Sequence, residues 1–138
     1  MSSDDDSVIY SSRTFVRSHR WWDASWVDWN YRYRGGPVLT VRHDSFEVSA
    51  TQGMMMESRH FIVSSSTATM WFDIVGWAGT PFGRRRSIHI VWRNKRGRKI
   101  ELALSPDDGL QEAWEALLQS GVTLEVGRSA PPPDSSDA

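Results

Sequence analysis

The sequence contains no cysteine, so disulfides, thiolate metal sites and cysteine nucleophiles are excluded. It also has no long apolar run: the least polar window, residues 61–79, includes four consecutive hydroxyl residues and Asp73, which does not suit a membrane span. The N-terminal MSSDDDS has neither the basic nor the apolar part of a secretory signal. These absences lead us to expect a soluble, cytoplasmic protein.

Catalytic and metal-binding patterns are equally scarce. The four histidines are scattered without metal-site spacing: His19, His43, His60 and His89. The contiguous His43-Asp44-Ser45 indicates a turn, since a catalytic triad is assembled by geometry. The loop 79–83 lacks the lysine and the following helix of a phosphate-binding loop. We therefore expect no enzyme, no cofactor and no metal; the alternative, a small hydrolase, would need two of His43, His60 and His89 and an acid in one pocket.

Aromatic residues are abundant, with eight Trp, five Phe and three Tyr in 138 residues. This supply, in a chain long enough for one domain, predicts a substantial hydrophobic core. The densest cluster comprises Trp21, Trp22, Trp26 and Trp29. We expect these rings to pack as a lid or satellite cluster on the core. The alternative is an exposed aromatic platform for a partner.

The stretch RRRSIHIVWRNKRGRKIELALSPDDG, which begins at Arg84, predicts a basic β-hairpin. A loop of residues 95–97, with Gly97 in the left-handed conformation, pairs Trp92 with Ile100 and aligns the apolar residues of both strands on one face. The other face then carries Arg93 opposite Lys99. This like-charge pair is destabilising unless something negative lies nearby.

An amphipathic helix follows the hairpin. Ser105 is the expected N-cap, Pro106 the first helical residue and Gly121 the terminator. The buried stripe has helical spacing and comprises Leu110, Ala113, Trp114, Leu117 and Leu118. Such a helix needs an apolar surface, so it should lie on the sheet or close the end of a barrel.

The remaining strands are expected at 27–33, 38–43, 46–50, 59–64 and 69–77. Residues 8–17 are predicted to form a strand outside the main sheet, and 122–126 a short terminal strand against them. Two residues, Asp44-Ser45, should close the 38–50 hairpin, with Arg42 opposite Glu47. We expect one domain over residues 8–127, flanked by a disordered acidic tail at 1–7 and a disordered Pro/Asp-rich tail at 128–138.

Seven strands over residues 27–104, followed by one helix with a buried Trp, resemble the pleckstrin-homology-like (PH-like) superfold. The stretch GTPFGRRRSIHIVWRNKRGRKIELALSPDDGLQEAWEALLQSGV is most similar to bacterial PH-like domains. The resemblance implies a seven-stranded antiparallel split barrel of two orthogonal sheets, capped by the C-terminal helix. It also points to basic residues near the first hairpin, here Arg32, Arg34 and Arg42, although Asp44 stands where another cation is expected in phosphoinositide-binding members.

Half of all Lys and Arg residues lie between Arg84 and Lys99, where no acidic residue occurs. These eight are the candidate site: Arg84, Arg85, Arg86, Arg93, Lys95, Arg96, Arg98 and Lys99. We expect them to gather on one end and one face and to dock an anionic partner, either an acidic protein segment or an anionic membrane surface. Nucleic acid is the alternative partner. The structural alternative is a solvated turn whose charges prevent aggregation of an edge strand.

Overall fold

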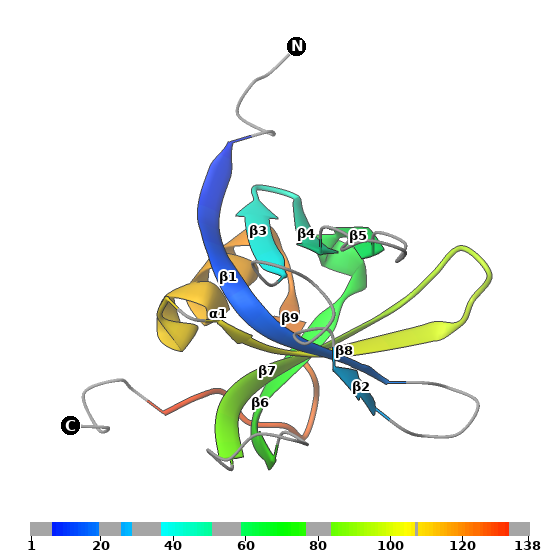
Figure 1. Cartoon of the computed structure of the whole chain (residues 1–138). Coiled ribbons are helices and arrows are strands. Elements are labelled where there is room, and N and C mark those ends of the chain that lie inside the picture. Colours follow the sequence, from blue (N-terminus) through cyan, green and yellow to red (C-terminus); the bar gives the residue numbers. More distant parts are fainter. Residues whose placement is uncertain are drawn as a thin grey trace.

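The computed structural model describes residues 7–19, 26–28, 37–50, 59–76, 84–106 and 108–132. These residues form a mainly β protein with one α-helix near the C-terminus (Figure 1). The elements are β1 (Val8–His19), β2 (Trp26–Asp28), β3 (Val38–Arg42), β4 (Ser45–Ala50), β5 (Arg59–Ser64), the 3-10 helix η2 (Ser65–Thr67), β6 (Thr69–Gly76), β7 (Arg84–Arg93), β8 (Lys99–Pro106), α1 (Leu110–Ser120) and β9 (Thr123–Leu124).

All nine described strands belong to one open sheet. Eight follow the order β5-β4-β3-β1-β8-β7-β6-β9, and β2 pairs with β1 off this path. Every pairing is antiparallel except that of β6 with β9. The described strands thus form a mainly antiparallel sheet that includes β1, with β9 running parallel to β6 at one edge.

Strand β1 joins the two halves of the sheet (Figure 1). Its first half pairs with β3 and its second half with β8 and β2. The prediction that this segment lies outside the main sheet was wrong. Its inward positions include Ser12 and Thr14 beside Val16, so the apolar alternation is weak. Both hydroxyls donate to the carbonyl of the following residue, which allows burial of these side chains without loss of hydrogen bonds.

The β7–β8 hairpin confirms its predicted register. Trp92 pairs with Ile100, Ile90 with Leu102 and Ile88 with Leu104. Gly97 has φ +79° in the connecting turn, as the three-residue loop requires. The inward side chains of this hairpin are largely buried, and Trp92 packs edge-on against Phe46 at 5.8 Å between ring centres.

Helix α1 packs against strands from both halves of the sheet, including β1, β3 and β7. Its buried side includes Trp114 and the fully buried Leu117, as predicted, and Gly121 at φ +123° ends it. Leu118, by contrast, is 44% exposed. The stripe is therefore narrower on that side than the spacing suggested.

The predicted N-cap of the helix was wrong. Ser105 and Pro106 belong to β8 and pair with β1, and the Ser105 hydroxyl donates to the Arg86 carbonyl at 2.9 Å. The helix instead begins at Leu110 after Gly109, whose φ is +73°. Tertiary pairing of the β8 end thus overrides the local capping signal.

Two other pairings differ from expectation. In the β3–β4 hairpin, Thr40 rather than Arg42 lies opposite Glu47. This shift of two residues keeps the same side chains inside, and the Asp44 carbonyl, which accepts from the Ser65 N–H, holds the longer loop. The terminal strand β9 pairs with β6 instead of with residues 8–17.

The ordered backbone continues past the predicted domain end at Gly127. The Phe72 N–H donates to the Ser129 carbonyl at 2.9 Å, so residues 128–132, which the sequence places in a tail, begin alongside β6. Of the predicted strand at 27–33, only residues up to Asp28 are described, in β2. Most of the Trp21–Trp29 cluster, the loop 51–58 and Arg32 and Arg34 lie outside the described residues. Within the described ranges, no helix has the length and apolar character needed to cross a membrane.

Candidate anion-binding site

The eight candidate cations occupy two separate places on the β7–β8 hairpin. Arg84, Arg85 and Arg86 begin β7, opposite the end of β6, whereas the other five surround the turn at the far end. The ten residues of β7 span roughly 30 Å at 3.3 Å per residue. The structure therefore does not bring the Arg84–Arg86 group together with the turn.

The Arg84–Arg86 group contributes little that can be described as a site. The side chains of Arg84 and Arg85 lie outside the described part of the molecule. Arg86 is half-buried, and its guanidinium carbon lies 5.6 Å from the centre of the Phe72 ring. Packing against an aromatic ring is a structural role for this arginine.

The turn holds the remaining five cations, which we call the basic turn: Arg93, Lys95, Arg96, Arg98 and Lys99. Every residue from Arg93 to Lys99 is exposed, and the hairpin projects from the body of the molecule (Figure 1). The Asn94 side-chain oxygen accepts from the backbone N–H groups of Arg96 and Arg98 at 2.9 and 3.0 Å. The Arg93 Nη1 donates to the Gly97 carbonyl at 2.8 Å. These bonds fix the loop backbone before any partner arrives.

Like charges face each other across the two strands of the basic turn. Arg93 lies directly opposite Lys99, as predicted. Among the residues that the structure describes, no carboxylate lies within ion-pair distance of Arg93, Lys95, Arg96 or Lys99. Two like charges on neighbouring strands repel each other, so an anion placed between them would stabilise both.

A cavity of about 580 Å³ adjoins the basic turn. It is lined by Thr67, Thr69, Val91, Trp92, Arg93, Lys99 and Glu125. Arg93 and Lys99 bring positive charge to it from the hairpin, and Glu125 brings negative charge from the segment after β9. An open cavity with both signs of charge suits a small charged group rather than a wholly apolar ligand.

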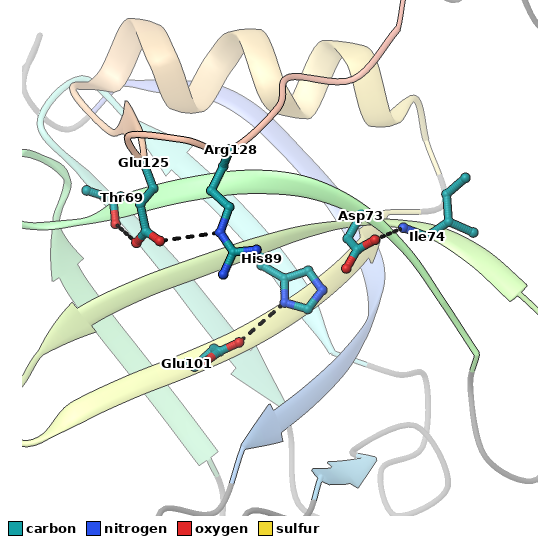
Figure 2. Close-up of polar contacts among 7 residues, drawn as sticks. All are labelled: Thr69, Asp73, Ile74, His89, Glu101, Glu125 and Arg128. Atoms are coloured by element: carbon teal, nitrogen blue, oxygen red, sulfur yellow. Dashed lines mark hydrogen bonds and ion pairs between the residues drawn. The ribbon is translucent and has the colours of Figure 1, made fainter.

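Glu125 is held in place by four bonds, and Figure 2 shows the contacts of its carboxylate with Thr69 and Arg128. Its backbone N–H donates to the Met70 carbonyl at 2.9 Å. One carboxylate oxygen accepts from the Thr69 hydroxyl at 3.2 Å, and the other lies 3.5 Å from Arg128 Nε. The Arg128 backbone N–H donates to the Glu125 carbonyl, which closes the turn between them.

Beside this cavity lies a second polar cluster, formed by Trp71, His89 and Glu101 on the same face of the sheet. The His89 ring stacks on Trp71 at 5.1 Å and its Nδ1 lies 3.4 Å from a Glu101 oxygen (Figure 2). His89 lies opposite Ala103 and is only 6% exposed. Burial beneath neighbouring side chains makes it a packed residue.

His60 and His89 belong to separate sites. His60 Nε2 lies 2.6 Å from Glu47, on β5 and β4, whereas His89 faces Glu101 on β7 and β8. Arg42 lies 3.8 Å from the same Glu47, diagonally rather than directly opposite. In the described ranges, no three His, Asp or Glu side chains converge as a metal site would require.

Sequence reasoning missed Thr67, Thr69 and Glu125 as cavity residues. Thr69 approaches the hairpin because β6 pairs with β7, whereas the approach of Glu125 depends on β9 lying beside β6. The sequence assigned the terminal strand to a different partner. The local sequence of a two-residue strand such as Thr123–Leu124 does not specify which strand it pairs with.

No protein-family model matches the chain, and no curated protein matches it significantly. The geometry of the basic turn and its cavity is therefore the basis for assigning a function.

Proposed function

We propose that this protein is a non-catalytic binding module of PH-like fold that docks an anionic partner through the basic turn. The observation that carries the proposal is a pre-formed, projecting loop with five cations, four of which have no described carboxylate within ion-pair distance. A loop already held in one conformation loses little conformational entropy when it binds.

The strand order supports the PH-like part of the proposal. The path β5-β4-β3-β1-β8-β7-β6 contains seven antiparallel strands, with β1 shared between two halves and a helix after the last strand. The first of these seven is Val8–His19 rather than the predicted segment 27–33. On this alignment, β2 and β9 are additions to the seven-stranded plan.

An anionic membrane surface is the partner that the turn fits best. Each Lys or Arg near an anionic bilayer contributes about 1 kcal/mol, which makes a projecting turn with five cations a sufficient anchor for reversible binding. Nucleic acid is less well matched, because Trp92, the aromatic residue nearest the turn in sequence, is 7% exposed and packs in the core.

Sedimentation with phosphatidylglycerol-containing vesicles tests this proposal. Replacement of Lys95 by Ser should weaken binding about fivefold, the equivalent of about 1 kcal/mol. The matched control is Arg13→Ser, which removes one exposed cation from β1, far from the turn.

Binding that is absent at low salt, or that falls equally in the two variants, would contradict the proposal. An acidic peptide and a single-stranded oligonucleotide serve as parallel probes. Tighter binding to either of them than to the vesicles would reassign the partner.

A further inference from the structure

The cavity beside the basic turn carries opposite charges on its two sides. Arg93 and Lys99 line it from the hairpin and Glu125 from the segment after β9. We infer that it binds a phosphate group that carries a primary amine a few bonds away, as in the headgroup of phosphatidylethanolamine or in free O-phosphoethanolamine. This inference rests on the proposed function and names the ligand chemistry of the same site.

The phosphate side follows from the two cations. A guanidinium and an ammonium on adjacent strands can share one phosphate, because its several oxygens accept hydrogen bonds from both. Arg93 uses Nη1 for the Gly97 carbonyl, and its other N–H groups can serve a ligand. The same phosphate would relieve the repulsion between Arg93 and Lys99.

The amine side follows from Glu125. A carboxylate has about four acceptor positions, of which Thr69 and Arg128 each occupy one. The Glu125 side chain is 38% exposed and lines the cavity, so it is accessible to a donor from the ligand. A bare phosphate would be repelled by this carboxylate, whereas an ammonium on the ligand turns the repulsion into attraction.

The separation of the two sides fits such a group. Glu125 follows β9, which lies beside β6, and Arg93 ends β7 on the other side of β6. Two strand spacings correspond to about 10 Å across the sheet, and the pairing registers offset the two residues by about four positions, or about 13 Å, along it, so the two backbones lie roughly 16 Å apart. Side chains that enter from both sides leave room for a phosphate and an amine linked by two carbons.

A quaternary amine is a poorer fit. Choline has no N–H to donate to Glu125, and its recognition relies on the faces of several aromatic rings. Trp92 is the aromatic residue of the cavity lining, and its ring is engaged edge-on with Phe46 and Phe61 at 5.8 and 5.4 Å. The cavity therefore favours an amine that retains its N–H groups.

Two assays separate the possible sources of this group. The first compares vesicles of phosphatidylethanolamine and phosphatidylglycerol with vesicles of phosphatidylcholine and the same fraction of phosphatidylglycerol, so net charge is equal. The second compares soluble O-phosphoethanolamine with glycerol 3-phosphate by calorimetry or NMR titration. We expect about tenfold tighter binding to the amine-bearing member of a pair, the size of one charge-assisted hydrogen bond.

The decisive variant is Glu125→Gln, which keeps an acceptor for Thr69 but removes the charge. It should abolish the preference for the amine and leave phosphatidylglycerol binding intact or stronger. The matched control, Glu115→Gln, makes the same charge change on the exposed side of α1 and should keep the preference. Thermal melting of both variants verifies that they fold.

A preference in the vesicle assay alone supports the lipid headgroup as the ligand, and one in the soluble assay alone supports a free amino-phosphate. Equal binding to both members in both assays, with phosphatidylglycerol binding retained, overturns the inference while the proposed function stands. Failure of all vesicles and soluble probes to bind overturns both.

Discussion

The guanidinium carbon of Arg128 lies 4.5 Å from the centre of the Trp71 ring. His89 stacks on the same ring at 5.1 Å. Arg128 Nε also lies 3.5 Å from Glu125, which lines the cavity. Arg128 therefore contacts both Trp71 on β6 and a cavity residue. The C-terminal segment is therefore part of the site as well as part of the fold.

Replacement of Arg128 by Ala should loosen this segment. A partly exposed cation–π contact contributes about 0.5–1 kcal/mol, and loss of that amount is the expected drop in the free energy of unfolding by urea. The sharper readout is hydrogen exchange at the Phe72 N–H, which bonds to the Ser129 carbonyl and should exchange faster. Unchanged exchange at Phe72 would show that Arg128 does not fasten the segment.

The turn of the hairpin depends on the backbone conformation of Gly97. Its φ is +79° and a Cβ there would meet no atom within 4 Å, so the cost of Gly97→Ala is conformational alone. We expect a loss of about 1 kcal/mol in the free energy of unfolding, with a smaller loss for Gly97→Asn. Equal losses for Ala and Asn, measured by urea unfolding, would argue against the left-handed conformation.

The β7–β8 hairpin was predictable because its signals are local. Alternation of apolar residues fixes the inner face, and the position of Gly97 fixes the loop length, so one register satisfies both. The signal that ends helix α1, a glycine at position 121, is also local. Each signal lies within a few residues of the structure it specifies.

The misassigned elements depend on distant partners. Ser12 and Thr14 are polar residues at inward positions of β1, so the apolar alternation that predicts a strand is weak there. The central place of β1 in the sheet follows from its pairing with β3 and β8. Ser105 carries a helix-capping signal that strand pairing overrides. The cavity could not be predicted for the same reason, since Glu125 reaches the basic turn only through the pairing of β9 with β6.

Ser105 offers a direct test of that override. Its hydroxyl bonds to the Arg86 carbonyl within the sheet, so Ser105→Ala should cost about 1 kcal/mol without change in helix content by circular dichroism. A measurable loss of helical signal in the folded variant would instead restore Ser105 as the cap of α1.

The packing of α1 is tested by two adjacent leucines. Leu117 is fully buried and Leu118 is 44% exposed. Truncation of Leu117 to Ala should cost about 2–5 kcal/mol, as for other buried leucines, whereas surface substitutions such as Leu118→Ala stay within about 0.5 kcal/mol. Similar losses for both, by urea denaturation, would mean that the helix presents a different face to the sheet.

The most direct test of the docking role is an amide NMR titration with bicelles that contain phosphatidylglycerol. We predict that the largest shift changes and line broadening fall on residues 93–99, with Gly97 and Arg98 among them, and that β5 residues such as Ile62 are unaffected. Changes centred on β5 or on α1, or none at the turn while the protein binds, would contradict the assignment of the basic turn as the docking site.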